Sequence, residues 1–458
     1  MDVFIVHTSS NKVIIIGAGP AGLSAAYELQ KHKANVDCIE ATKNIGGMCR
    51  TIEYKGYRFD IGGHGFFSNN KEIFELWYDL LEGDFIKYSS RTMLYYRHHY
   101  FNFPPGIVEV LNKIGVIECY KIIFSLLKYH FIPIKNASTL EDVMKNNFGD
   151  YFYQRFIKKF MAKVWGTPCH LLAPEASMTV HSIKPLIIIK NKFMKTNKTV
   201  SGGRYPRYGA GQMYDALYDR VKKNGVNFQQ NCKAIKLICC HNHIKNVIIE
   251  TPTGDQRIPS SHVLSSIPLK DLIEMIDPEL PNSVLVAASQ LSYRSLIIVN
   301  LILESNIHIP FTCVNIQDPN IRMSRIHCFK NWSMKMVPDE SKCSLECEYF
   351  VAEEEELWRT PDDDLIDMAK EELQRVRLLS MKDIIEGFVI RIPKAYPLLT
   401  IDHARLLKII NAELDVIDNL QSIGRGGMHS YNTMDEAMLT GILASRNILL
   451  VSKLEKNI

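Results

Sequence analysis

The stretch Lys12–Glu40, KVIIIGAGPAGLSAAYELQKHKANVDCIE, decides the fold of the first part of the chain. It opens with an apolar β-branched run, Lys12–Ile16, which predicts a buried parallel strand. A glycine-rich turn follows, then a segment of helix-forming composition over 23–30, and then a second strand-like run over 34–40 that ends in an acid. Strand, glycine turn, helix, strand and acid in this order predict a dinucleotide-binding βαβ unit.

Each residue type in this turn has a separate physical reason. Gly17 allows the tight turn, Gly19 lets the backbone approach a pyrophosphate, and Gly22 lets the helix pack closely on the strand. The helix N-terminus then offers free N–H groups to the phosphates, and a carboxylate at position 40 can hold ribose hydroxyls. A glycine turn in an ordinary α/β domain would leave that acid unexplained. The predicted cofactor-binding residues of this unit are Gly17, Gly19, Pro20, Ala21, Gly22 and Glu40.

Composition excludes several classes of protein. The 458 residues are 46% hydrophobic and 23% charged, which is typical of globular proteins and leaves room for two or three domains. A net charge of +4 is too small to favour nucleic acid as a partner. Aromatic and basic residues do alternate over 151–164, but a helix with an aromatic core face explains them more simply than an RNA site.

Targeting and metal-binding signals are weak. The first ten residues lack the features of a signal peptide, and no apolar stretch reaches the roughly 18 residues that a membrane span needs. The 11 scattered cysteines therefore predict reduced thiols and a cytoplasmic protein. Neither Cys239–Cys240 nor the Cys343/Cys347 pair has a matching second pair at zinc spacing, so we predict no metal site.

The segment after the acid carries a resemblance to a known group of enzymes. It reads IGGMCRT over 45–51 and GYRFDIGGH over 56–64. Together with Glu40, this block resembles the amine-oxidase and protoporphyrinogen-oxidase group of flavoproteins. The resemblance implies FAD rather than NAD as the cofactor, with Gly47, Met48 and Arg50 along its pyrophosphate.

Short segments through most of the chain also resemble UDP-galactopyranose mutase, the flavoenzyme that contracts a sugar ring. The matching segments include GHGF from Gly63, KVWG from Lys163, RYP from Arg204, SRI from Ser324, and AYP from Ala395. In that family the histidine of the first segment lies against the flavin near N5, so the resemblance implies such a role for His64 and a flavin contact for Gly63.

The same resemblance implies a substrate site. Trp165 would form the nucleotide-side wall, Arg204 and Arg325 would bind the diphosphate, and the Tyr396 hydroxyl would touch it. Arg207 is an added basic residue that could bind the same phosphates. The catalytic residues are then His64, Arg204, Arg325 and Tyr396.

A second glycine-rich loop, GRGGMHSYNTMD, begins at Gly424 and precedes a predicted helix over 435–448. Loops of this kind before a helix bind anions. By the resemblance, Gly424, Arg425, Met434 and Asp435 close over the FAD, and Tyr431 faces the substrate. The family has a diphosphate-binding tyrosine where this chain has His429, so we expect that histidine to bind a phosphate and the sugar nucleotide to differ.

The resemblance implies an α/β fold: a doubly wound, Rossmann-like FAD-binding domain of the GR2 type, a helical insert, and an antiparallel β-sheet substrate domain. The expected FAD-binding segments are residues 1–70, 201–270 and 401–458. Residues 71–200 form the expected helical insert, and residues 271–400 form the expected antiparallel sheet.

The implied reaction is an isomerisation in polysaccharide or glycoconjugate biosynthesis, in which N5 of reduced FAD acts as the nucleophile on a UDP-sugar. NADPH or NADH could supply the electrons, and a homo-oligomer is consistent with the sequence. Two alternatives stay open. One is an FAD-dependent amine or alcohol oxidase or dehydrogenase, which shares the FAD motifs but needs no paired arginines. The other is a flavin-binding protein without enzyme activity.

Overall fold

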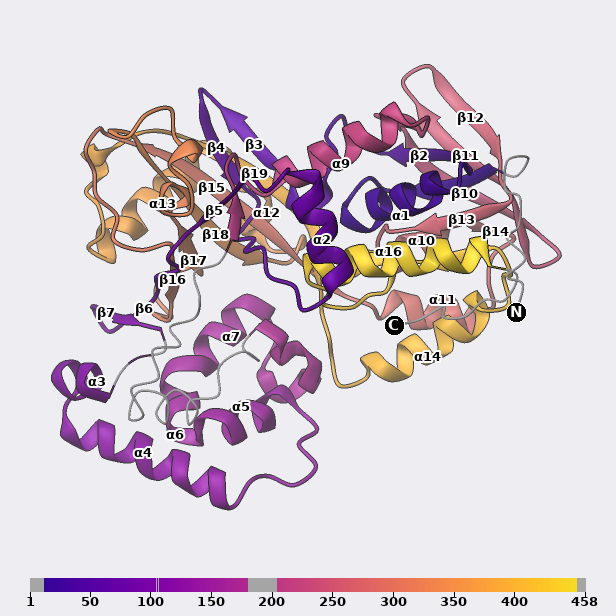
Figure 1. The fold of residues 1–458 in the computed structure, drawn as a ribbon. Coiled ribbons are helices and arrows are strands. Elements are labelled where there is room, and N and C mark those ends of the chain that lie inside the picture. Colours follow the sequence, from indigo (N-terminus) through magenta and orange to yellow (C-terminus); the bar gives the residue numbers. More distant parts are fainter. Residues whose placement is uncertain (1–11, 104, 106, 180–203, 451–458) are drawn as a thin grey trace.

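A parallel sheet of five strands forms the nucleotide-binding core of the protein (Figure 1). The computed structural model describes residues 12–103, 105, 107–179 and 204–450. The sheet order is β20-β13-β1-β2-β9. The strands span Lys12–Ile16 (β1), Asn35–Glu40 (β2), Asn227–Gln230 (β9), His262–Ser265 (β13) and Leu420–Ser422 (β20). Three segments far apart in the sequence thus build one sheet, as expected for a domain that the chain leaves and re-enters.

Helices cover both faces of this sheet because the strand residues alternate between two cores. Val13 and Ile15 pack in one core with α1 (Pro20–Lys31), α9 (Gly211–Lys223) and α16 (Met434–Leu449). Ile14 and Ile16 pack in the other core. That second core contains α10 (Leu269–Met275), α11 (Asn282–Ser289), α14 (His403–Leu414) and the sheet β12-β11-β10-β14. The strands of this small sheet are β10 (Lys233–Cys240), β11 (His243–Thr251), β12 (Gly254–Pro259) and β14 (Ile276–Asp277). The doubly wound α/β fold is confirmed.

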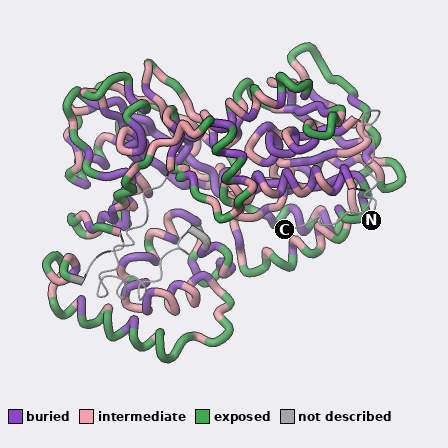
Figure 2. Tube along the Cα trace, in the orientation of Figure 1, coloured by how far each residue is buried: buried purple, intermediate pink, exposed green. Residues whose placement is uncertain are grey.

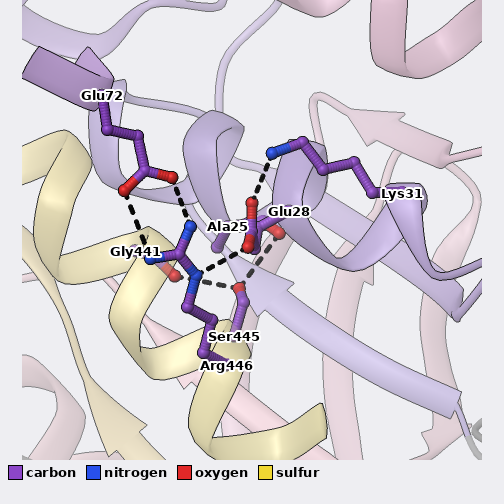
Figure 3. A network of polar contacts seen from close by, with 7 residues as sticks. All are labelled: Ala25, Glu28, Lys31, Glu72, Gly441, Ser445 and Arg446. Carbon is purple, nitrogen blue, oxygen red and sulfur yellow. Dashed lines mark hydrogen bonds and ion pairs between the residues drawn. The ribbon is translucent and has the colours of Figure 1, made fainter. Parts of the chain in front are cut away.

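A polar network ties the last helix to the first two (Figure 3). Arg446 of α16 donates to Glu28 of α1 at 2.7 Å and forms an ion pair with Glu72 of α2 (Lys71–Leu80). Glu28 also accepts from Lys31. Because α1 begins at the glycine turn, these contacts fix the turn relative to the C-terminal part of the chain.

A second sheet of seven strands, in the order β19-β15-β18-β17-β16-β6-β7, forms the other half of the α/β body. Its strands are β15 (Tyr293–Leu303), β16 (Cys313–Ile316), β17 (Arg325–His327), β18 (Cys343–Val351) and β19 (Ile384–Pro397), with β6 (Thr92–Tyr96) and β7 (His99–Asn102) at one edge. One face packs on α13 (Asp362–Arg375). The opposite face packs on Ile61 of the nucleotide-binding part and Val164 of the helical lobe. All pairings are antiparallel except β16 with β6.

Except for α2, which packs in the core with α1, α9 and α16, the helices of the expected insert gather in a separate lobe (Figure 1). They are α3 (Ile107–Ile114), α4 (Val116–Phe131), α5 (Leu140–Phe148), α6 (Asp150–Phe152) and α7 (Lys158–Trp165). The remaining short strands pair as β3 (Thr51–Tyr54) with β4 (Tyr57–Asp60), and β5 (Phe85–Lys87) with β8 (Arg204–Pro206). Within the described residues, no helix is both long enough and apolar enough to cross a bilayer.

The segment expected to be a mostly helical insert, 71–200, differs from that expectation in its first part. Residues 92–96 and 99–102 form β6 and β7, which join the large sheet instead of the helical lobe. The reason is local: Arg97 and His98 both have positive φ and close a two-residue hairpin between aromatic, β-forming residues. Helices α10 and α11, expected in the sheet domain, pack in the nucleotide-binding core. The expected boundary at residues 200–201 lies outside the described residues.

Candidate functional site

The first glycine turn has the conformation that the motif predicts. Gly17 has φ +100°, and its N–H donates to the Ile39 carbonyl at 2.8 Å. A Cβ on Gly22 would lie 1.9 Å from the Gly17 carbonyl oxygen, so only glycine fits there. Helix α1 begins at Pro20 without a side-chain cap, with Ala21 buried behind it. Its first N–H groups are therefore available to an anion.

Glu40 lies at the carboxyl end of β2, beside this turn. Its carboxylate accepts from the backbone N–H of Ala18 at 2.9 Å and from the N–H of Thr42 at 3.0 Å. These bonds hold the side chain where the second strand ends. An acid held at this edge of a parallel sheet is in the position that binds a ribose in dinucleotide-binding folds.

The second glycine pair lies directly over the first. A Cβ on Gly47 would lie 3.1 Å from the Cα of Gly19, and Gly47 has φ +54°. Arg50 donates to the Gly47 carbonyl at 2.6 Å, while its Nε is buried with no hydrogen-bond partner among the described residues. Met48 stays partly exposed beside it. Close backbone approach and an unpartnered guanidinium nitrogen fit the phosphates of a dinucleotide.

The loop at Gly424 closes the same region from the C-terminal side. A Cβ on Gly424 would lie 2.8 Å from the Cβ of Ala21. Arg425 donates to the Asn432 carbonyl at 2.8 Å, which folds the loop back on itself. Asp435 accepts from Ser68 at 2.6 Å, and Met434 begins α16 beside it. The structure thus brings the two predicted glycine loops together around the N-terminus of α1.

His64 lies in the turn after β4, between two exposed glycines, Gly63 and Gly65. Its Nε2 lies 2.8 Å from the Ile61 carbonyl oxygen and 3.0 Å from the Met48 carbonyl oxygen. Since both partners only accept, Nε2 carries the proton and Nδ1 keeps a lone pair. Burial, together with the charge of Arg425, lowers the pKa of His64 to about 4. The imidazole is therefore neutral at pH 7.

A group of arginines and aromatic rings lies next to this turn, and we call it the arginine–aromatic group. The rings of Tyr396 and Tyr431 are stacked at 6.0 Å, and the guanidinium of Arg425 lies 5.1 and 4.7 Å from them. Its members come from α7, β17, β18, β19 and the Gly424 loop. They are Trp165, Arg325, Phe350, Tyr396, Arg425 and Tyr431.

Two further members complete the contacts of the group. The Arg325 guanidinium lies 4.9 Å from the Phe350 ring, which packs on Tyr396. Trp165 meets Tyr431 edge to face, and its buried Nε1 has no hydrogen-bond partner among the described residues. Burial raises the pKa of Tyr396 to about 12, so its hydroxyl stays a donor at neutral pH. Cations, donors and aromatic faces in one place suit a nucleotide with phosphates.

Trp165 is held in place by bonds between the helical lobe and the large sheet. Lys163, two residues earlier, donates to the carbonyls of Ile316, Asp318 and Met323 at 3.0–3.1 Å. Arg294 of β15 donates to the carbonyl of Val164 at 3.3 Å. The helix then ends at Gly166, which has φ +63°. These contacts explain how a side chain from the helical lobe reaches the sheet.

Beneath Arg325 lies a buried polar cluster that the sequence reasoning missed: His327, Glu346 and Glu348. Glu348 lies 2.8 Å from Arg325 and 3.3 Å from His327. Although burial alone would raise it, the charge of Arg325 lowers the pKa of Glu348 to about 2. Burial raises the pKa of Glu346 well above its ordinary range. Glu348 is therefore charged at neutral pH, whereas burial disfavours the charged form of Glu346.

A sequence signal for this cluster exists. Ser344, Glu346 and Glu348 alternate with apolar residues in the run Cys343–Val351, so they share one face of a strand. Polar residues on one face of a strand that is buried throughout mark a site or a polar network. The cluster also adjoins His64, because a Cβ on Gly62 would lie 3.0 Å from Glu348 and a Cβ on Gly63 would lie 2.8 Å from His327.

Three predicted substrate residues lie outside the arginine–aromatic group. The Arg204 guanidinium lies 5.2 Å from the Phe74 ring on α2. Arg207 pairs with Asp84 at 2.6 Å. His429 is fully buried with φ +45°, packed edge to face on Tyr293, and its Nε2 lies 3.2 Å from the Ser292 carbonyl oxygen.

The comparisons with solved structures identify the fold. Reduced UDP-galactopyranose mutase superposes with a TM-score of 0.81 at 21% identity, covering 96% of this chain and 95% of that one. A putative protoporphyrinogen oxidase from Exiguobacterium sp. 255-15 gives 0.75 at 14% identity, covering 96% and 99%. At these identities, the similarity establishes the shared fold.

The curated relatives are oxidoreductases by name. Coproporphyrinogen III oxidase of Staphylococcus aureus is 24% identical over 266 residues, which are 52% of this chain and 57% of that protein. The 1-hydroxycarotenoid 3,4-desaturase of a Flavobacterium is 39% identical over 282 residues, covering 54% and 55%. The chain thus spans little more than half the length of these relatives.

A family match covers nearly the whole chain. Residues 20–449 match the family described as flavin containing amine oxidoreductase. The match takes in α1, the large sheet, the Gly424 loop and all of α16. The glycine loops, Glu40 and Arg50 are the parts of this chain that fit FAD. The chain is an FAD-dependent flavoenzyme and belongs to the flavin containing amine oxidoreductase family.

Proposed function

We propose that this flavoenzyme acts on a nucleotide sugar, as a UDP-galactopyranose mutase-like isomerase. The observation that carries the proposal is the arginine–aromatic group, in which Arg325 and Arg425 lie among Tyr396, Tyr431 and Trp165. A uracil ring suits the aromatic side of this group, and a diphosphate suits its arginines. The similarity to reduced UDP-galactopyranose mutase supports the same class of substrate.

The residues around the glycine loops would hold the FAD. Gly17–Gly22, Glu40, Gly47 and Arg50 would bind its dinucleotide part, and the Gly424 loop would close over it. When bound and reduced, FAD supplies a nucleophilic nitrogen, N5, that can displace a nucleoside diphosphate from a sugar. NADPH or NADH is the proposed source of its electrons.

His64 would act through its free Nδ1. Its Nε2–H is occupied by the carbonyls of Ile61 and Met48, so Nδ1 points its lone pair elsewhere and can accept a proton or a hydrogen bond. Its lowered pKa keeps that lone pair available at neutral pH. A neutral acceptor next to the flavin ring would favour the protonated, reduced form at N5.

Arg325 would stabilise the charge of the leaving diphosphate. Its guanidinium is pinned on one side by the Glu348 carboxylate, which leaves its remaining N–H groups for phosphate oxygens. The Tyr396 hydroxyl would orient the same group. Arg204 would approach the diphosphate from the α2 side. Because His429 packs between Tyr293 and His403, we assign it a packing role in place of the expected phosphate contact.

Turnover of UDP-galactofuranose tests the proposal. The FAD-loaded protein is assayed by chromatography with the flavin oxidised in one tube and reduced by dithionite in the other. We expect conversion to the pyranose only in the reduced tube. Conversion in neither tube, with other UDP-sugars also unchanged, would rule the proposal out.

One specific finding favours a second function, an FAD-dependent oxidase or dehydrogenase. The curated relatives are named as a porphyrinogen oxidase and a carotenoid desaturase. Such an enzyme would reduce its flavin with an amine, alcohol or polyene substrate and would show no change of the flavin spectrum with UDP. Bleaching of the oxidised flavin by one of these substrates, without any UDP effect, would establish this function.

A further inference from the structure

Helix α4 (Val116–Phe131) carries an apolar face that points away from the protein. It forms the outer edge of the helical lobe, on the side away from the nucleotide-binding sheet (Figure 1). Figure 2 shows this edge as largely exposed. Its exposed large apolar side chains include Ile117, Tyr120, Ile123, Phe124, Leu127 and Phe131.

These six side chains form a continuous stripe. At about 100° per residue they fall within an arc of about 120° around the helix axis. Ile117, Tyr120 and Phe131 are 71%, 67% and 76% exposed, so the stripe is open to solvent. Scattered exposed apolar residues are ordinary, but a contiguous stripe along one helix marks a binding surface.

Packing within the lobe does not explain the stripe. The side of α4 that faces the lobe is buried at Cys119, Ser125 and Leu126. Ser125 accepts a hydrogen bond from the backbone N–H of Tyr151 at 3.0 Å, so that side is partly polar. Ile122 of the same helix packs against the core of the lobe, so α4 is apolar on its outward side as well as on its inward side, whereas an ordinary surface helix is polar on its outward side.

The charges around the stripe have one sign. Lys121 and Lys128 lie on the helix next to the stripe, and both are exposed. Neither has an ion-pair partner within the described part of the chain. The acid of this helix, Glu118, instead points inward, where it accepts from the Tyr151 hydroxyl at 2.7 Å. The two lysines each lie over an aromatic ring, Lys121 over Tyr151 and Lys128 over Tyr129. An apolar stripe bordered by such lysines is complementary to an apolar layer covered by anions.

We propose that the outward face of α4 docks on an anionic phospholipid surface. The helix is about 24 Å long at 1.5 Å per residue and would lie flat at the level of the headgroups. The stripe would enter the acyl boundary, and Lys121 and Lys128 would reach the lipid phosphates. A second copy of the chain fits less well, because pairing two such faces would bring lysines together with no free acid opposite them.

Vesicle binding of the full, FAD-loaded chain tests this assignment. The probes are phosphatidylcholine vesicles with and without about one-third phosphatidylglycerol. We expect binding to the anionic vesicles and a loss of about tenfold or more for Ile117→Ser/Phe124→Ser. Lys121→Gln and Lys128→Gln should each weaken binding about fivefold.

A matched control removes two similarly exposed apolar residues elsewhere. Val286→Ser/Val416→Ser takes away side chains that are 48% and 49% exposed and lie outside the helical lobe. We expect this variant to bind vesicles like the unsubstituted protein. Flavin absorbance and far-ultraviolet circular dichroism of every variant show whether each has kept its fold.

The results of these measurements distinguish an anionic membrane from a second copy of the chain as the partner of this face. Equal vesicle binding by the Ile117→Ser/Phe124→Ser variant, or no binding by the unsubstituted protein, would overturn the proposal. The unsubstituted protein could instead fail to bind vesicles and form a concentration-dependent dimer that the Ile117→Ser/Phe124→Ser variant does not form. That result would assign the face to a second copy of the chain.

Discussion

The two ends of the candidate site are built in different ways. At the nucleotide end, glycines from three loops approach one another so closely that a single Cβ would collide with backbone, as at Gly22 against Gly17. At the arginine–aromatic end, side chains from five separate elements meet at ring and cation distances of about 5 to 6.5 Å. The difference teaches that backbone contacts shape the region that fits the cofactor, while side chains shape the proposed substrate site.

The largest effect is expected at the nucleotide end. Gly22→Ala would place a methyl group 1.9 Å from the Gly17 carbonyl oxygen, and backbone cannot yield there. We expect a protein that is purified without flavin or not obtained in folded form, measured as bound FAD per chain. Gly225→Ala is the control for backbone strain without crowding, because its φ of +99° disfavours a side chain while its Cβ would meet no atom within 4 Å. We expect it to lose some stability and to keep its FAD. Equal FAD content in both variants would show that close packing at Gly22 is unimportant.

Next in size is the effect of the buried carboxylates behind the arginine–aromatic group. Glu348→Gln removes a charge that Arg325 and His327 both use, and losing one partner of a buried pair costs about 3 to 5 kcal/mol. Burial raises the pKa of Glu346, which disfavours its charged form. Glu346→Gln is therefore expected to change the free energy of unfolding by less than about 1 kcal/mol. Urea denaturation at pH 7 measures both. A larger loss of stability for Glu346→Gln than for Glu348→Gln would mean that Glu346 is the carboxylate whose charge stabilises the fold.

Acid should weaken the fold through His429, whose pKa burial lowers to about 4. Because the unfolded chain binds a proton near pH 6.5 and the folded chain does not, the free energy of unfolding falls as the pH drops from about 6.5 to 4. His429→Asn keeps the positive φ and removes the titration. Over this range, we expect the free energy of unfolding to fall by about 2 to 3 kcal/mol less in this variant than in the unsubstituted protein.

Urea midpoints between pH 7 and pH 4.5 give this comparison. The comparison uses the slope of the free energy of unfolding against pH. The absolute stabilities differ at every pH, because the variant has lost the ring contacts with Tyr293 and His403. Parallel slopes would mean that His429 is already charged in the folded protein.

The smallest effect is expected at Arg207. Its guanidinium is bound to Asp84 and lies apart from the arginine–aromatic group. Arg207→Ala should change kcat/KM for the nucleotide sugar by less than about threefold, while Arg204→Ala should change it by about tenfold or more. A larger loss at Arg207 would mean that its pair with Asp84 opens during the reaction.

The sequence predicts the nucleotide end well because its determinants are local. Gly17, Gly19, Gly22 and Glu40 all lie within one βαβ unit, and their spacing corresponds directly to the turn and the strand end. The predicted fold class follows from the same unit. Strand β6 was missed because one of its partners, β16, lies more than 200 residues away in the sequence, and β7 joins the sheet only through β6.

The substrate end was only partly predictable. Trp165, Arg325, Tyr396, Arg425 and Tyr431 were found one at a time, and the structure brings them together. His429 was misleading: a histidine next to a glycine loop suggests a ligand contact, but its buried ring packs on Tyr293. Glu348 was missed because it acts through Arg325, a partner on another strand.

Binding of UDP to the oxidised, FAD-loaded protein tests the central claim most directly, because it needs no turnover. Calorimetry would follow the unsubstituted protein, Arg325→Ala, and Arg207→Ala as the matched control. The account predicts UDP binding that Arg325→Ala weakens by about a hundredfold, which is about 2.7 kcal/mol, and that Arg207→Ala leaves nearly unchanged. No binding of UDP, or equal binding by all three proteins, would contradict it.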